Sequence, residues 1–223
     1  MLAALDAEFG FHGRAFDYST VEPVCFVLRF VDGKQVRACP RLGLPWSCLV
    51  PFLTNPEILI CTHNGYDAER QVLRRVGLPF PSGHWWDTLL AERVLHVVKR
   101  GDLAVDRPDR KGGPYTLLNC LRRRGLPARE SEAKQAMAEK IGHLEFSDSE
   151  LPRILDYCAE DCADTLALAQ RQLPEIAKLP EKMRNLYWHT IQPHALRTSA
   201  MSEKGIHFDA ESYNILQSNQ EWL

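Results

Sequence analysis

The sequence lacks several features that would place it in a specialised class of protein. Its longest apolar runs, around residues 24–31 and 58–61, have the length of a strand and are too short to cross a membrane. The first five residues are apolar, but no basic stretch precedes them, so a secretory leader is not expected. Internal repeats and low-complexity tracts are also missing. These absences predict a cytoplasmic protein that makes no contact with a membrane.

Zinc-type cysteine spacing and an excess of positive charge are missing as well. The seven cysteines are odd in number and scattered, and no two follow a C-x₂-C spacing. This pattern is typical of reduced thiols in a cytosolic protein core. Lys and Arg number 27 against 29 Asp and Glu, which gives a net charge of −2. Any affinity for nucleic acid must therefore come from a local patch or from bound cations.

The order of the expected elements predicts an α/β fold. With 223 residues, 45% of them hydrophobic, the chain can bury a sizeable core. A strand at residues 2–8 is expected beside a β-hairpin that turns at Asp32-Gly33. A strand at 58–61, a helix that ends at Gly77, a strand end near residues 84–88 and further helices follow. This order favours a mixed central sheet flanked by helices.

A long helix is expected after residue 149. Ser149 is the candidate N-cap, and Pro152 falls in the first turn, where its missing N–H does no harm. Residues 100–115 are expected to form a charged loop. Toward the C-terminus the pattern changes to a short helical segment, which is too small for a domain and indicates the beginning of another one.

Acidic residues recur where strands and helices meet. Asp6 and Glu8 alternate on the first strand, so both carboxylates project to the same face. Asp67 and Glu69 follow the strand at 58–61 at the start of a helix, where acids also serve as simple caps. Taken singly, each of these residues is more common as a surface or capping residue. Their combination is what carries information.

A third pair completes a recognisable set. Tyr157 and Asp161 lie four residues apart and so share one face of the long helix. The acid-x-acid strand, the acids after His63-Asn64 and the segment YCAEDCADTLAL together resemble the three motifs of the DEDD 3′–5′ exonucleases. The resemblance is strongest to the proofreading domain of family A (DNA polymerase I-like) DNA polymerases.

The third motif indicates the subtype. DEDDh enzymes have a histidine five residues before the last aspartate, and Asp156 stands there in this chain. Tyr157, four residues before Asp161, matches the DEDDy pattern. The resemblance implies a ribonuclease H-like (DnaQ-like) exonuclease fold over residues 1–175. For residues 176–223 it implies a helical segment similar to the start of the polymerase domain, and it points to a bacterial, plasmid or phage origin.

The second motif departs from the family pattern. Family members place its acid four residues after the asparagine, which is Ala68 in this chain. Asp67 stands one residue early and Glu69 one residue late. In the family, apolar residues follow the acid at +3 and +4 and a glycine at +8. Counting from Glu69 reproduces this pattern with Val72, Leu73 and Gly77. We therefore favour Glu69 and keep Asp67 as the alternative.

The resemblance implies a metal-dependent exonuclease that removes nucleotides from the 3′ end of single-stranded DNA during proofreading. Tyr157 would orient the attacking water, because an unperturbed tyrosine titrates near ~10 and is a poor general base. The implied partners are the DNA 3′ end and the polymerase portion of the same or a parent protein, and we expect a monomer. Two Mg²⁺ or Mn²⁺ ions would be held by four carboxylates, which are Asp6, Glu8, Asp161 and either Glu69 or Asp67.

Other residues are candidates for contact with the nucleic acid. Between residues 95 and 129, nine basic residues stand against three acidic ones, and Arg122 and Arg123 are the candidates for backbone contacts. A solvated helix face explains them equally well. Phe9 and Phe11 could stack on terminal bases or belong to the core, and Asn64 is a further candidate.

Two alternatives to DNA proofreading stay open. DEDDy enzymes that process RNA share the same motifs, so an exoribonuclease is the first alternative. A degenerate exonuclease fold that only binds DNA or has a structural role is the second, and the irregular second motif favours it.

Overall fold

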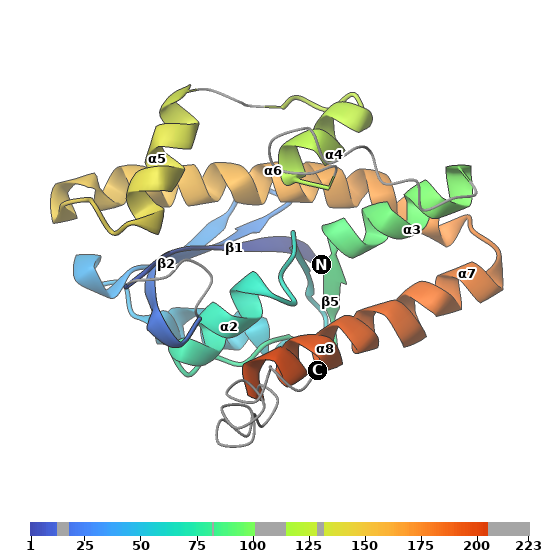
Figure 1. The fold of residues 1–223 in the computed structure, drawn as a ribbon, viewed down its shortest axis with the longest axis horizontal. Coiled ribbons are helices and arrows are strands. Elements are labelled where there is room, and N and C mark those ends of the chain that lie inside the picture. Colours follow the sequence, from blue (N-terminus) through green and yellow to red (C-terminus); the bar gives the residue numbers. More distant parts are fainter. Residues whose placement is uncertain (13–17, 82, 101–114, 129–131, 205–223) are drawn as a thin grey trace, which may run out of the picture.

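The computed structural model describes residues 1–12, 18–81, 83–100, 115–128 and 132–204 (Figure 1). One five-stranded sheet has the strand order β3-β2-β1-β4-β5. The strand β1 is antiparallel to β2 and parallel to β4, β2 is antiparallel to β3, and β4 is parallel to β5. The predicted α/β fold with a mixed sheet is confirmed. The strands are β1 (Leu2–Phe11), β2 (Val21–Phe30), β3 (Gln35–Ala38), β4 (Leu59–Thr62) and β5 (Trp85–Asp87).

The hairpin between β2 and β3 turns where the sequence predicts. Gly33 has a φ of 88°, a conformation that glycine adopts without the steric penalty of other residues. The backbone N–H of Lys34 donates to Oδ1 of Asp32 at 3.0 Å and closes the turn. The turn therefore fixes the register of two strands that β1 then joins.

Helices cover both faces of the sheet and form three layers (Figure 1). The longest helix, α6, packs against β1 and β2 on one face, while α2 packs against the same two strands on the other. Among the described residues, no helix combines the length and apolar character needed to span a bilayer. The α6 side holds α3 (Thr88–Arg100), α4 (Leu117–Arg123), α5 (Glu132–Gly142) and α6 (Leu151–Ala177), and the opposite side holds α1 (Val50–Leu53) and α2 (Ala68–Arg75).

The alternation of side chains along β1 decides where its acids point. Ala4 belongs to the core under α6, whereas Ala3 and Leu5 belong to the core under α1 and α2. Because successive side chains in a strand point to opposite faces, Asp6 and Glu8 follow Ala4 and face α6. The strand thus changes from apolar to acidic on one face only.

The start of α6 differs from the prediction. Ser149 does not cap the helix, because a 3₁₀ turn at Asp148–Glu150 precedes it. Ser147 instead forms a capping box with Glu150, whose Oε2 accepts the Ser147 backbone N–H at 3.0 Å. Only Ser147 stands three residues before a glutamate, which is the spacing a capping box requires. Pro152 lies in the first turn, as predicted.

The C-terminal helices pack back onto the sheet. The helix α7 (Glu181–Asn185), a π-helical turn (Leu186–Ile191) and α8 (Gln192–Lys204) follow α6. Tyr187 donates its hydroxyl to the carbonyl of Asp87 at 3.1 Å, and Gln192 donates to the carbonyl of Trp85 at 2.8 Å. These contacts join the segment to β5. The division into units at residues 175/176 stays a prediction, and the positions after 204 lie outside the described residues.

Candidate active site

The sheet leaves one flank of β1 open where its acids lie. The strand β4 pairs with β1 only over Leu2, Ala3 and Ala4, and the chain then turns away after Thr62. The C-terminal half of β1 therefore continues beyond its parallel neighbour. The carboxyl ends of strands in α/β sheets are common positions for binding sites.

Acids from this part of β1 lie close to a thiol from α6. Carboxylate oxygens of Asp6 and Glu8 and the thiol sulfur of Cys158 all lie within 4.8 Å of one another. The sequence indicated only that the cysteines are reduced thiols of the core, and it did not single out Cys158. Its position next to Tyr157 was the available signal, because a residue beside a site residue on a helix lies near the same edge of the site.

A lysine from α5 reaches the same cluster. Lys134 donates to the carboxylate of Asp161, and its Nζ lies 3.9 Å from the carboxylate of Asp164. The same ammonium is 5.4 Å from the centre of the Tyr157 ring, within the range of a cation–π contact. No sequence feature pointed to Lys134, since it reaches the cluster only through the packing of α5 beside α6.

Burial and mutual repulsion raise the pKa values of the acids. The pKa of Asp6 rises to about 7, first because the carboxyl is buried and second because Asp161 is close. The pKa of Glu8 lies well above its usual range through burial and the charge of Asp6. Burial also raises the pKa of Asp161, and Lys134 opposes this rise. The cluster therefore carries its full negative charge only when a further cation is present.

Tyr157 is held in its protonated form. Burial raises the pKa of its hydroxyl first, and the charges of Glu8 and Asp161 raise it further. A hydrogen bond from Tyr157 in turn lowers the pKa of Asp161. The predicted contact between residues four apart on the helix is thus present, and the hydroxyl serves as a donor.

The second-motif acids have different surroundings. Glu69 is 4% exposed, and its Oε2 has no hydrogen-bond partner in the described part of the chain. Its pKa lies well above the usual range because of burial first and the charge of Asp6 second. Asp67, at the start of α2, is only half-buried, and burial alone raises its pKa. Glu69 is therefore the more buried of the two acids, and of the two it is the one whose pKa the charge of Asp6 raises.

The turn that leads to Glu69 is tightly built. Asn64 has a φ of 71°, and its carbonyl accepts the backbone N–H of Ala68 at 3.2 Å. A Cβ on Gly65 would stand 2.1 Å from Oγ1 of Thr62, so no side chain fits at that position. The turn brings the start of α2 close to the end of β4.

Asp87, at the end of β5, accepts a hydrogen bond from this turn. Its Oδ2 accepts the backbone N–H of Gly65 at 2.7 Å, and its Oδ1 accepts that of Leu90 at 3.0 Å. Burial raises its pKa to about 6. The sequence predicted only a strand end here, although an aspartate just before a helix is a common capping signal. Asp87 is a positioning residue for the second motif.

The predicted contacts to nucleic acid are placed in two regions. Phe9 and Phe11 are partly buried and pack edge-to-face at 5.7 Å, with Tyr18 beside both rings. Arg122 and Arg123 lie on α4, on the side of α6 away from the sheet. Of the basic stretch at 99–129, only the side chains of 122–124 are described.

Comparisons with known proteins identify the fold. No family model and no curated protein matches the sequence. The catalytic core of RRP6 from Trypanosoma brucei superposes with a TM-score of 0.57 at 13% identity, covering 87% of this chain and 46% of its own. RNase D from Escherichia coli, an exoribonuclease involved in structured RNA processing, gives 0.55 at 19% identity, covering 87% and 45%. The fold is the ribonuclease H-like exonuclease fold.

A third structure matches over nearly its whole length. A nuclease in its apo form has a TM-score of 0.58 at 17% identity, and the match covers 94% of this chain and 89% of that one. The chain spans somewhat less than half the length of the RRP6 core and of RNase D. The predicted fold class is therefore confirmed, whereas the family A assignment continues to depend on the sequence resemblance.

Proposed function

We propose that the protein is a metal-dependent 3′–5′ exonuclease of the DEDDy type. The observation that carries this proposal is the set of buried and half-buried carboxylates that β1, α2 and α6 supply near the end of β1. Asp6, Glu69 and Asp161 each come from a different element, and burial raises the pKa of all three. Such an arrangement is costly unless it serves to bind cations.

The donor set fits hard divalent cations. Mg²⁺ and Mn²⁺ prefer carboxylate oxygens, and the oxygens of Asp6 and Glu8 already lie within 4.8 Å of each other. The unpartnered Oε2 of Glu69 is a buried acceptor that a cation would satisfy. Asp6, Glu8, Glu69 and Asp161 would hold two ions, and Asp67 would take no part.

Hydrolysis would proceed at the last phosphodiester of a strand. The two ions that Asp6, Glu8, Glu69 and Asp161 would hold would lower the pKa of a bound water and stabilise negative charge on the leaving 3′ oxygen. Tyr157 keeps its proton and donates a hydrogen bond to Asp161, so its hydroxyl oxygen would orient the attacking water by accepting a hydrogen bond from it. Water adds to phosphorus, the bond to the 3′ oxygen breaks, and a nucleoside 5′-monophosphate leaves.

We propose single-stranded DNA as the substrate, in a proofreading role beside the polymerase portion of the same or a parent protein. The resemblance of residues 2–173 and 181–215 to family A polymerases supports this choice. RNA is the second candidate, and the similarity of the fold to RNase D and to the RRP6 core favours it.

A single digestion experiment tests the function and the substrate together. 5′-Labelled single-stranded DNA and RNA of the same sequence would each be incubated with Mg²⁺, Mn²⁺ or EDTA. The expected result is a metal-dependent ladder that shortens from the 3′ end, more rapidly for DNA. Faster shortening of RNA would favour the exoribonuclease.

The same experiment distinguishes an enzyme from a degenerate fold. Asp6→Asn should remove the ladder without changing the circular dichroism spectrum. If the folded wild-type protein cleaves neither strand in either metal, the protein is a binding or structural module instead.

A further inference from the structure

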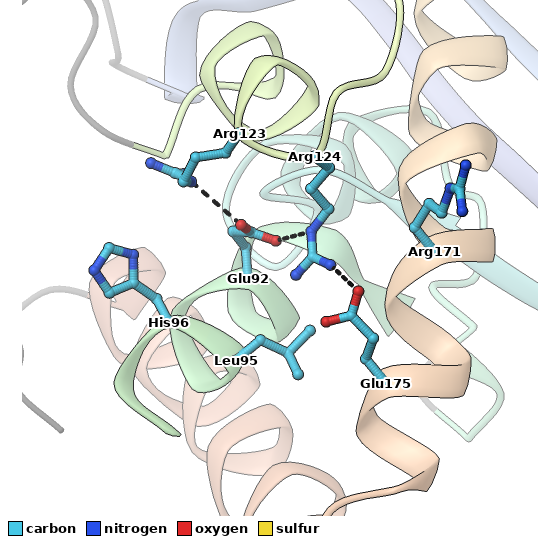
Figure 2. Close-up of a pocket in the computed structure, with 7 residues that line it drawn as sticks. All are labelled: Glu92, Leu95, His96, Arg123, Arg124, Arg171 and Glu175. Carbon is cyan, nitrogen blue, oxygen red and sulfur yellow. Dashed lines mark hydrogen bonds and ion pairs between the residues drawn. The ribbon is translucent and has the colours of Figure 1, made fainter. Parts of the chain in front are cut away.

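A second charged cavity lies away from the carboxylates. It has a volume of about 450 Å³ and is enclosed by α3, α4 and α6 (Figure 2). Arg171 and Glu175 follow Asp161 on α6, and at about 1.5 Å per residue they lie roughly 15–20 Å further along the helix. The cavity is lined by Glu92, Leu95, His96, Arg123, Arg124, Arg171 and Glu175.

One part of the cavity is a closed network of charges. Glu92 is 3% exposed and accepts hydrogen bonds from Nε of Arg124 at 2.8 Å and from Nε of Arg123 at 3.3 Å. Nε2 of Gln172 adds a third bond to Glu92 at 3.0 Å. The other end of Arg124 donates to Glu175. These groups hydrogen-bond to one another and form one wall of the cavity.

Two polar side chains of the lining have groups without a hydrogen-bond partner among the described residues. Arg171 is exposed and makes no hydrogen bond or ion pair with any residue that the structure describes. His96 is 7% exposed, and its Nε2 has no hydrogen-bond partner in the described part of the chain. Three guanidinium groups face two carboxylates, so the lining carries one excess positive charge. Figure 2 shows Arg171 and His96 at opposite ends of the lining, so an anion beside Arg171 would balance this excess charge.

A stack of rings and guanidinium groups leads from the second motif to the cavity. The guanidinium carbons of Arg93 and Arg123 lie 5.4 and 5.3 Å from the centre of the Tyr115 ring. The ring of His96 meets the same tyrosine edge-on at 5.9 Å. The carbonyl of Tyr115 accepts a hydrogen bond from Nε2 of His63 at 2.9 Å, immediately before the turn that positions Glu69. Basic and aromatic groups thus connect the two sites.

We propose that this cavity binds a backbone phosphate of the same single strand whose 3′ end lies at the carboxylates. The proposal depends on the proposed function for the placing of that end. Arg171 would contact the phosphate, and the rim formed by Arg93, Tyr115 and Arg123 would carry the strand between the two sites, as basic and aromatic grooves do in other single-strand binders. At about 3.4 Å per stacked nucleotide, the separation corresponds to roughly four to six nucleotides.

The test measures binding without catalysis. Fluorescein-labelled dT₃, dT₆ and dT₁₂ would be titrated with protein in EDTA and followed by anisotropy. We expect dT₁₂ to bind more tightly than dT₃. Arg171→Gln should weaken dT₁₂ binding by up to about five-fold, the effect of one exposed charge contact, and should lower the slope of log K against log salt by about 0.7. Binding of dT₃ should stay unchanged.

Arg153→Gln is the matched control, because Arg153 is exposed on the same helix outside the cavity. Equal weakening by both variants would mean that bulk charge acts and would overturn the proposal, as would equal affinity of wild type and Arg171→Gln for dT₁₂. Competition by dTMP that depends on Arg171 as strongly as dT₁₂ binding does would indicate a mononucleotide site and contradict strand binding. A length-dependent, Arg171-dependent signal from a protein that cleaves nothing would sustain the strand site while the proposed hydrolysis fails.

Discussion

Two buried glutamates in this protein have opposite surroundings. Glu92, under α4, is 3% exposed and is bonded by two arginines and a glutamine. Glu69, on α2, is 4% exposed, and its Oε2 has no partner among the described residues. Side chains of the protein itself supply the hydrogen bonds and the positive charge that the Glu92 carboxylate needs. The second faces other acids, and the charge of Asp6 raises its pKa.

The difference separates structural from functional charge. A buried carboxylate that is paired with guanidinium groups has its charge neutralised at neutral pH. The ion pairs also link the helices that carry these groups. Among the described residues, one lysine lies beside the other group of carboxylates, and a bound cation would supply the positive charge that this group lacks. The comparison therefore predicts that changes at the two places have different consequences.

The largest effect is expected from Asp6→Ala on hydrolysis. Loss of a metal-holding carboxylate removes several kcal/mol of transition-state stabilisation, which corresponds to roughly 1000-fold or more in rate. The metal-free variant should unfold at the same or a higher temperature than wild type, because one repelling charge is gone. Initial rates on labelled DNA and a thermal melt in EDTA measure both. A destabilised metal-free variant would contradict the account of repulsion.

A large loss of stability is expected from Glu92→Gln. Glu92→Gln removes the buried charge that both Arg123 and Arg124 bond, and we expect a cost of about 3 kcal/mol. Glu69→Gln, the same chemical change in the other surroundings, should not lower the free energy of unfolding in EDTA. Urea denaturation of both variants gives the comparison directly. Equal losses would mean that both carboxylates are structural.

The pH dependence of stability should carry the signature of Asp6. In the folded, metal-free protein the carboxyl of Asp6 keeps its proton up to about pH 7, because its pKa is raised from the usual value of 3.8. The unfolded chain binds fewer protons in this window, so the contribution of Asp6 makes the free energy of unfolding fall as pH rises from about 4 to 7. Burial lowers the pKa of His63 to about 4, so the contribution of His63 makes the free energy of unfolding rise with pH. This rise masks the contribution of Asp6 when only the total free energy of unfolding is measured.

A difference measurement isolates the contribution of Asp6. In EDTA, Asp6→Asn should become progressively more stable than wild type between about pH 4 and pH 7, because the variant has no charge to bury. Added Mg²⁺ should stabilise wild type most at the upper end of this pH range, since the ions bind the deprotonated acids. A constant difference across this range would show that Asp6 has an ordinary pKa.

A smaller effect is expected from Lys134→Met. Removing the ammonium from Asp161 should lower the stability of the metal-free protein by about 1 kcal/mol, and the difference should vanish when Mg²⁺ is saturating. Lys140→Met, on the same helix and paired with the exposed Glu150, is the control and should be insensitive to metal. A Lys134→Met loss that persists in Mg²⁺ would assign the lysine a structural role.

The sequence predicted those parts of the site that depend on local spacing. Asp6 and Glu8 share a face because side chains alternate along a strand, and Tyr157 meets Asp161 because they are one helical turn apart. The turn at Asp32-Gly33 followed from the conformational freedom of glycine.

The parts that depend on packing between distant elements were missed. Lys134 and Cys158 join the acids only because α5 and α6 dock beside β1, and Asp87 reaches Gly65 across two strands. The cap at Ser147 rather than Ser149 depended on which serine had a glutamate three residues later. Helix register favoured Glu69 over Asp67, and its burial opposite Asp6 supplies the tertiary reason.

Direct titration with Mn²⁺ tests the central claim, that acids from three elements form one metal site. Isothermal calorimetry on the wild-type protein, Glu69→Gln and Asp67→Asn would measure both affinity and stoichiometry. We expect two ions per chain for wild type and for Asp67→Asn, and an affinity at least about ten-fold weaker for Glu69→Gln. Absence of binding at millimolar Mn²⁺, or loss of binding in Asp67→Asn with retention in Glu69→Gln, would contradict it.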